Sequence, residues 1–395
     1  MGLPDILKIA FVIGFFVFGL TPGMVIVERR LSAWMQGRIG PDRVGPLGLL
    51  QPLADAIKFI FKEDIIPDEA DRVLFVLAPL MVLVPPALGL IVIPFGNQIG
   101  DEPLQVANLS VGVLFSMSVL SIAVYGLAFG GWASNNKFSL LGGLRASAQL
   151  VSYELALGLS IISVLMMSAG HPDYLLGTLD PRAIVDRQIA HGWNIIGGGN
   201  WWLLPCGLVG FILFFISALA ENNRLPFDLP ECEAELVGGY HTEYSSMKFA
   251  LFMMGEYVGM TVMAALMTTF FLGGWHLPGV TDPSSHTLVA GLLSVGVFIG
   301  KVVAILFVYV VIRWTLPRFK YNQLMNLGWK RLVPLALANV MAVAVIGVLT
   351  GSPAESHPKP RAMMKPGAVV VEAAAKAGVF AEAQFPQGAK AGGAK

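Results

Sequence analysis

Residues 203–235 of this chain join an apolar segment to an acidic one, and they read LLPCGLVGFILFFISALAENNRLPFDLPECEAE. The apolar part approaches the ~20 residues that a helix needs to cross a bilayer. The acidic part opens a region from Glu221 to Glu256 with seven carboxylates, although charged residues make up only 13% of the chain. Because an ionised carboxylate near lipid is costly, this concentration of acids indicates a path or relay for protons or cations.

Part of the acidic region has a simpler explanation, in which residues 231–235 form the first turns of a helix. The N-terminus of a helix favours negative charge, and Asp228 with Pro230 is typical of a helix start. That explanation does not account for Glu221, Glu243 and Glu256. We therefore expect a functional cluster that comprises Glu221, Asp228, Glu231, Glu233, Glu235, Glu243 and Glu256.

Composition predicts an all-α polytopic membrane protein, because 55% of residues are hydrophobic and the mean hydropathy is +0.69. Eight apolar runs are near the length of a membrane span. Residues 1–350 would form the membrane domain, and residues 351–395, rich in Ala, Lys and Pro, would be disordered. The expected spans are 6–27, 73–95, 107–129, 147–169, 203–220, 247–273, 286–316 and 333–350.

Orientation follows from the basic residues between the spans. The first, third, fifth and seventh connections carry fourteen lysines and arginines, and the others carry two. Basic connections stay in the cytoplasm, so both termini are predicted to lie outside. The first apolar run is too long for a cleavable signal and is interpreted as a retained span.

The sequence of the first connection, residues 28–72, predicts an unusual membrane loop. Residues 37–46 contain two Gly-Pro pairs, which are typical of defined turns. Residues 49–61 alternate apolar and polar side chains at helical spacing, which predicts an amphipathic helix at the membrane interface. Together, the loop and the helix would form either a surface loop with an interfacial anchor or one wall of an apolar ligand pocket near the headgroups.

Several charged residues fall inside or beside the spans. Glu154 lies in the fourth span, where a carboxylate must be paired or protonated. Lys301 lies inside the seventh span and requires a buried carboxylate partner, for which Glu256 is the natural candidate. Glu28 and Arg29 lie at the end of the first span. Their simplest role is to anchor the span by extending their charged groups into the membrane interface.

Composition also argues against several functions. The net charge is zero, so the composition does not indicate nucleic-acid binding. Cys206 and Cys232 form no metal or iron–sulfur motif, and His171 and His191 have no nearby carboxylates that would complete a metal site. The tryptophans of the fourth connection are typical of an interfacial aromatic belt, and they are Trp193, Trp201 and Trp202.

Two long motifs resemble one family closely. One is GRIGPDRVGP at residues 37–46 with LLQPLAD at 49–55, and the other is AENNRLPFDLPE at 220–231 with HTEYSSMKFA at 241–250. They are similar to the H-type membrane subunit of respiratory complex I, the proton-translocating NADH:quinone oxidoreductase. The resemblance covers the chain from the first span to about Thr350.

The resemblance implies an eight-helix subunit of a prokaryotic inner membrane, where the peripheral redox arm meets the proton-pumping arm. It implies that this chain forms the quinone entrance and much of the quinone cavity, for ubiquinone or menaquinone. FMN and iron–sulfur clusters would belong to other subunits, so this chain would be inactive alone. The implied partners are the peripheral-arm quinone-site subunits, small membrane subunits and membrane lipid.

The resemblance also implies roles for individual residues. Those implied for the quinone cavity are Glu28, Arg29, Arg38, Asp55 and Lys58, and we expect Phe227 to join them. Those implied for proton coupling are Glu154, Glu221, Glu231, Glu233, Glu235, Glu243 and Glu256, and we expect Asp228 and Lys301 to join them.

The chain departs from the family pattern at a few positions. Asn222 replaces a common Thr, Leu225 a small residue, Asn322 a common Asp and Lys320 a usual Arg. Two other functions stay open: the equivalent subunit of a complex fed by ferredoxin or another donor, including a membrane-bound hydrogenase, and a free-standing ion transporter. The intact residues 37–55 argue against a hydrogenase, and the absence of an internal sequence repeat argues against a transporter.

Overall fold

A computed structural model of the chain describes residues 3–168, 177–229 and 236–350. Within these ranges the regular secondary structure is helical apart from a short hairpin of β1 (Gln98–Ile99) and β2 (Glu102–Pro103). Eight of its helical segments are long and apolar enough to cross a membrane, which confirms the predicted all-α polytopic class. They are Asp5–Met35, Arg72–Val92, Gly112–Ala133, Lys137–Ser168, Trp201–Glu221, Ser246–Phe271, Leu288–Thr315 and Tyr321–Leu349.

The first and last of these segments each contain a π-helical stretch. The first consists of α1 (Leu3–Phe11), the stretch Val12–Leu20 and α2 (Thr21–Met35). The last consists of α12 (Tyr321–Leu327), the stretch Gly328–Leu332 and α13 (Val333–Leu349). The other long helices are α4 (Arg72–Gly89), α5 (Gly112–Ala133), α6 (Lys137–Ser168), α8 (Leu204–Glu221), α10 (Ser246–Phe271) and α11 (Leu288–Thr315). Two shorter helices are α3 (Gln51–Phe61) and α7 (Pro181–His191).

Two helices begin well before the apolar runs that predicted them. We expected the fourth span to start at residue 147, but α6 starts at Lys137, and the last segment starts at Tyr321 instead of 333. The early turns of α6 mix polar and apolar residues, and some of the polar ones pack on protein: the Ser139 hydroxyl donates to the Tyr240 carbonyl at 2.9 Å.

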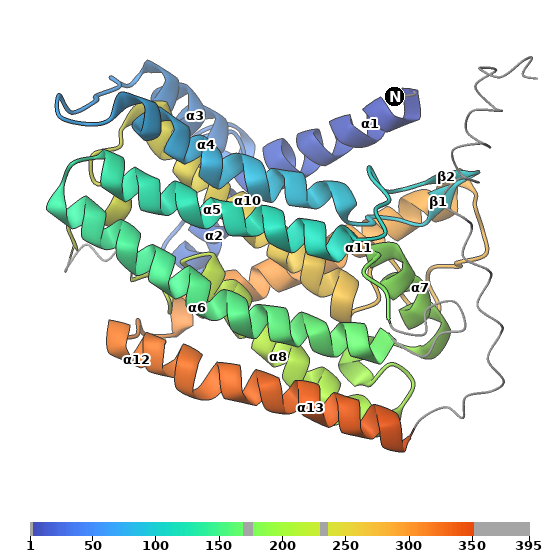
Figure 1. Cartoon of the computed structure of the whole chain (residues 1–395). Coiled ribbons are helices and arrows are strands. Elements are labelled where there is room, and N and C mark those ends of the chain that lie inside the picture. The colour runs from blue at the N-terminus through green and yellow to red at the C-terminus, as the bar shows by residue number, and fades with distance from the viewer. Residues whose placement is uncertain (1–2, 169–176, 230–235, 351–395) are drawn as a thin grey trace, which may run out of the picture. The chain divides into compact units, whose positions relative to one another are not determined.

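Helix α10 is the most enclosed element of the described fold. Nearly every residue from Gly255 to Phe271 is buried, as expected for a helix that is apolar on all sides. In Figure 1, α5 lies between α4 and α6, and α10 lies behind them. Most residues from Gly255 to Phe271 are consequently covered by the surrounding helices.

Helix α4 has three internal prolines, Pro79, Pro85 and Pro86. Proline has no N–H, so the carbonyl of Val82 cannot receive the usual helical hydrogen bond from Pro86. Helix α10 comes close at this point, because a Cβ atom on Gly255 would lie 3.0 Å from the Val82 carbonyl oxygen. The two backbones therefore touch at Gly255, directly before Glu256.

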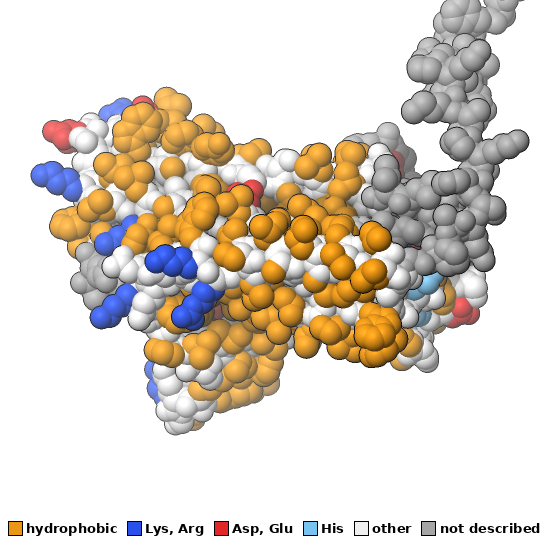
Figure 2. All heavy atoms as spheres, turned by 60° about the horizontal axis from the view of Figure 1, so that its bottom comes forward, with side chains coloured by type: hydrophobic (Ala, Val, Ile, Leu, Met, Phe, Trp, Pro, Cys, Tyr) orange, Lys and Arg blue, Asp and Glu red, His pale blue; other side chains and the backbone are white. Residues whose placement is uncertain are grey.

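The membrane-facing surface is broadly apolar. Figure 2 shows a face covered by hydrophobic side chains, with Lys and Arg gathered towards one end. None of the residues of α3 is buried, and the apolar side chains of Leu53, Ile57, Ile60 and Phe61 are exposed. This helix thus presents an uncovered apolar face, as its predicted amphipathic character requires.

Candidate functional site

Glu28 on α2 is the first member of a series of polar contacts inside the protein. Its carboxylate is only 6% exposed. It pairs with the guanidinium of Arg313 on α11 and accepts a 2.7 Å hydrogen bond from the Tyr257 hydroxyl on α10. The simple anchoring role expected for Glu28 is therefore wrong, because snorkelling would have left its carboxylate in the interface.

Arg224 continues this series from the connection after α8. Its guanidinium lies over the ring of Tyr257, 4.4 Å from the ring centroid. It also forms an ion pair with Glu256, with Nη2 and Oε2 3.1 Å apart. The Tyr240 hydroxyl donates to the other carboxylate oxygen of Glu256 at 2.7 Å. We call this series the buried polar chain, and its members are Arg313, Glu28, Tyr257, Arg224, Glu256 and Tyr240.

The sequence of α10 explains how the buried polar chain can turn inside the fold. Adjacent residues of an α-helix point about 100° apart, so Glu256 and Tyr257 face different neighbours. Glu256 faces the connection that carries Arg224 and Tyr240, and Tyr257 faces Glu28 on α2. Each buried carboxylate thereby meets one cation and one hydroxyl donor, which offsets the loss of hydration.

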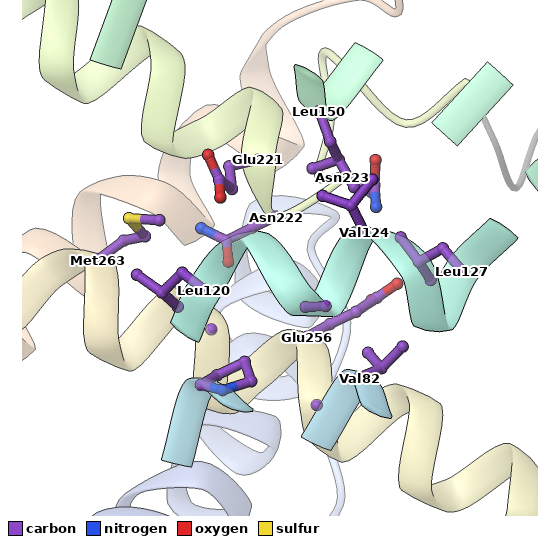
Figure 3. Close-up of a pocket in the computed structure, with 14 residues that line it drawn as sticks. Val82, Leu120, Val124, Leu127, Leu150, Glu221, Asn222, Asn223, Glu256 and Met263 are labelled. Atoms are coloured by element: carbon purple, nitrogen blue, oxygen red, sulfur yellow. The ribbon is translucent and has the colours of Figure 1, made fainter. Parts of the chain in front are cut away.

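A cavity adjoins this chain and contains a second carboxylate. The space in it that water can occupy is about 50 Å³, and it lies among α4, α5, α6, α10 and the end of α8. Figure 3 shows Glu221 and Glu256 on its wall together with Asn222 and Asn223. The Oε2 atom of Glu221 is buried and has no hydrogen-bond partner among the described residues. A cavity of this size has room for water, which could bridge the two carboxylates.

Two further predicted carboxylates lie at the borders of this region. Glu154 on α6 accepts a hydrogen bond from the Ser121 hydroxyl on α5, and it interacts electrostatically with Glu221. Glu243 accepts a 2.6 Å hydrogen bond from the Asn136 amide. The structure thus brings Glu154 towards the cavity and places Glu243 beside the start of α6.

Asp228 has a different partner in the same connection. Its carboxylate lies 2.9 Å from the guanidinium of Arg318, and the residue is 9% exposed. Burial raises the pKa of Asp228 to about 6, although Arg318 acts in the opposite direction. This carboxyl group therefore keeps its proton to a higher pH than an ordinary aspartate does.

The residues predicted for a quinone cavity form one clear pair. Arg29 Nη1 lies 2.6 Å from Asp55 Oδ2, which joins α2 to α3, and the Gln51 amide donates to the same carboxylate at 3.0 Å. Arg38 and Lys58 are exposed on the same connection. Phe227 is instead packed in the core, with its ring centroid 5.5 Å from that of Tyr153.

The predicted pairing of Lys301 with Glu256 is wrong. The Lys301 ammonium donates to the carbonyls of Leu272, Gly274 and His276 at 2.6, 3.0 and 2.6 Å. It also lies 4.6 Å from the ring centroid of Trp193. These carbonyls follow the C-terminus of α10, and their partial negative charge attracts the ammonium group of Lys301.

The predicted aromatic belt stays a prediction. Trp201 and Trp202 are 69% and 55% exposed, so their side chains are free to meet an interface. Trp193 is turned towards Lys301 and does not share that exposure. The glutamates predicted at 231, 233 and 235, together with His171 and Cys232, lie outside the described residues.

Sequence reasoning missed several members of the site. Arg224, Tyr240 and Tyr257 were assigned no role, although Arg224 is the one basic residue between 221 and 246. An isolated cation among carboxylates could have signalled an ion pair. Among the described residues no group of three or more His, Cys, Asp or Glu side chains could hold a metal ion.

The fold and the buried polar chain define a multi-pass helical membrane protein with an ionisable interior. A family model described as NADH dehydrogenase matches residues 7–344. The chain is 47% identical over 318 residues to the NADH-quinone oxidoreductase H-type subunit 1 of Cytophaga hutchinsonii, and the match covers 80% of this chain and 88% of that protein.

Two other relatives are similar to nearly the same extent. The NADH-quinone oxidoreductase H-type subunit 1 of Geobacter metallireducens is 48% identical over 346 residues, covering 87% of this chain and 96% of the relative. NADH-quinone oxidoreductase subunit 8 of Rhodothermus marinus is 44% identical over 328 residues, covering 82% and 91%. The chain therefore belongs to the NADH dehydrogenase family, and its resemblance to the H-type membrane subunit is confirmed.

Proposed function

We propose that this chain is the H-type membrane subunit of a proton-translocating NADH:quinone oxidoreductase. In this role it forms the quinone entrance and cavity together with partner subunits and couples quinone reduction to proton movement. The buried polar chain and its adjoining cavity carry the proposal. They bring several ionisable groups together inside the described fold, which a purely structural membrane protein would not need.

The coupling role rests on the mutual sensitivity of these charges. Closely spaced ionisable groups titrate as a set, so a charge change at one of them alters the proton affinity of the others. A reduction event near Glu28 would act on Tyr257, Arg224 and Glu256 in turn, and through the cavity on Glu221. The proposed coupling set also includes Glu154, Asp228, Glu243 and the glutamates at 231, 233 and 235.

The quinone role rests on the end of α2 and on α3. Glu28 and Arg29 are adjacent, so one faces the buried polar chain and the other faces Asp55. This places a surface ion pair directly next to the start of the interior path. The uncovered apolar face of α3 is suited to an isoprenoid tail, while exposed Arg38 and Lys58 are available to partner subunits.

Phe227 and Lys301 take supporting roles in this proposal. Phe227 packs against Tyr153 and Phe319 and thereby holds the connection that carries Arg224 and Asp228. Lys301 binds the end of α10, away from the buried polar chain. Asn222 keeps a polar side chain on the cavity wall, where its amide donates to the Ala218 carbonyl at 2.7 Å.

The remaining components follow from the same proposal. The electrons would come from FMN and iron–sulfur clusters in other subunits. The peripheral-arm quinone-site subunits would cover the side of this chain that carries the connection after α8. The protein would lie in the prokaryotic inner membrane with that connection in the cytoplasm and both termini outside. A related complex with another electron donor is the alternative, and the identity of the reductant distinguishes the two.

The test uses membranes with the assembled complex carrying Glu256→Gln or Glu221→Gln. Glu69→Gln is the matched control, because Glu69 is exposed and accepts a surface hydrogen bond from Asn135. We expect both site variants to assemble and to lose most NADH-driven quinone reduction and proton pumping, while the control keeps both. Wild-type activities in both site variants would contradict the coupling role, and reduction driven by ferredoxin but not NADH would favour the alternative.

A further inference from the structure

The C-terminal end of α3 is held by residues of another helix. Helix α3 ends at Phe61, and its C-cap residue Lys62 is extended, with φ −74° and ψ 142°. Carbonyl groups in the last turn of a helix have no partner within the helix, and many helices close that end with a left-handed residue of their own. Because the C-cap of α3 is extended, the carbonyls of its last turn depend on contacts from elsewhere in the fold.

Ser246, the first residue of α10, supplies the main contact. Its hydroxyl lies 2.8 Å from the Phe59 carbonyl and 2.9 Å from the Lys62 carbonyl, and it can donate to either of them. The residue is only 4% exposed, so this contact is shielded from water. Its φ is 54°, in the left-handed region that favours glycine. Because glycine would adopt this conformation more easily, the hydroxyl group is the feature that a serine adds here.

The neighbours of Ser246 extend the contact to the chain that follows α3. The Ser245 hydroxyl donates to the Glu63 carbonyl at 3.1 Å and accepts from the Ile65 N–H at 3.1 Å. The Lys248 ammonium lies 2.7 Å from the Asp64 carboxylate. We call Ser245, Ser246 and Lys248 the α3 latch, because together they bind the last turn of α3 and the residues after it.

The rest of α3 is loosely attached. Figure 1 shows it at the edge of the described fold, and none of its residues is buried. Its ion pair with α2, between Asp55 and Arg29, is partly exposed and therefore weak. The ring of Phe59 lies 6.1 Å from that of Phe249 on α10. Among the described residues, the Ser246 hydroxyl makes the best shielded polar contact to α3.

We propose that Ser246 is a positioning residue for quinone. Its effect rests on the proposed function, in which α3 borders the quinone entrance. By fixing the last turn of α3 to the start of α10, Ser246 determines where the apolar face of α3 lies. Without this hydroxyl, α3 still forms but its position varies, so quinone binds more weakly. The rate of the bound substrate does not change, because Ser246 does not touch the reacting atoms.

The test compares Ser246→Gly with Ser246→Ala in the assembled complex. Both variants remove the hydroxyl, but glycine accepts the left-handed φ and alanine does not. Ser284→Gly is the matched control, because Ser284 is an exposed serine whose hydroxyl bonds to Asp282, on the connection before α11. The measurements are kcat and KM for quinone, the melting temperature, and hydrogen exchange of residues 51–65 by mass spectrometry.

We expect both variants to raise the KM for quinone by the same factor of several-fold, to keep kcat, and to exchange faster in residues 59–65. Ser246→Gly should melt at a higher temperature than Ser246→Ala, since glycine removes the cost of the left-handed φ. The KM would then follow the hydroxyl and not the stability. The control should change none of these quantities.

Three results would overturn the positioning role. Unchanged hydrogen exchange in both variants would show that the latch does not hold α3. A KM that rises only in the less stable variant would show a merely structural effect. Faster exchange with an unchanged KM would separate α3 from quinone binding, and the same KM in Asp55→Asn would then place the failure in the proposed quinone role of α3.

Discussion

Arg224 and Glu256 form an ion pair 3.1 Å apart, and their side chains are only 7% and 4% exposed. The pair joins the connection after α8 to the most enclosed helix of the described fold. An ion pair in such a place gives little net stability compared with apolar residues, but breaking it leaves an uncompensated buried charge. Its two members should therefore behave as one unit in mutational experiments.

Arg224→Leu should destabilise the protein by about 3–5 kcal/mol, because Glu256 then has to remain buried without its cation or become protonated. The double variant Arg224→Leu/Glu256→Gln should recover a large part of that loss. The measurement is the thermal stability and the amount of assembled complex in membranes. A double variant as unstable as the single one would show that the ion pair is not the reason for the damage.

Lys301→Met should lower the stability of the protein by about 3 kcal/mol, because an ammonium group bonded to three carbonyls at the end of α10 is lost. The number of protons pumped per electron should stay at the wild-type value in the complex that does assemble. Lys330→Met, at an exposed position, is the control and should affect neither quantity. If Lys301→Met lost proton pumping but kept its stability, Lys301 would have to be counted among the proton-coupling residues.

Asp228 should dominate a pH-dependent transition near pH 6, because burial raises its pKa to about 6. The folded protein favours the protonated form of Asp228, because its pKa is about 6 in the fold and 3.8 in the ordinary, unfolded state. Its contribution to the stability of the fold is therefore complete below pH 3.8 and is lost as the pH rises through 6. Infrared titration of the carboxyl C=O band in the complex should show a component with this pKa. The component should be absent in Asp228→Asn and present in Asp64→Asn, and its survival in Asp228→Asn would assign it to another group.

Asp55→Asn should change quinone use more than stability. The Arg29–Asp55 pair is partly exposed, at 47% and 27%, so its loss should cost less than about 1 kcal/mol. If the pair borders the quinone entrance, the KM for quinone should rise several-fold. Asp42→Asn, on the same connection but exposed, serves as the control in steady-state assays. Equal KM values in wild type and both variants would remove Asp55 from the quinone site.

The sequence allowed the class of fold and the acidic region to be predicted, because both depend on local composition. Runs of apolar residues revealed eight spans, and spacing alone revealed the amphipathic α3. The partners of the charges were not predictable in the same way. Glu28 meets Arg313, which is 285 positions away, and Lys301 meets backbone carbonyls that carry no sequence signal. Such contacts depend on how the helices pack.

Gly255 has a consequence for natural variation in this family. Its missing side chain lets α10 contact the Val82 carbonyl of α4, and an added Cβ would also lie 2.8 Å from a Val82 methyl group. An alanine there would push the two helices apart and displace Glu256, the next residue, from Arg224 and Tyr240. A Gly255→Ala mutation adds one uncharged methyl group and is easily overlooked in a genome. Its carriers would nevertheless inherit a defect in the buried polar chain.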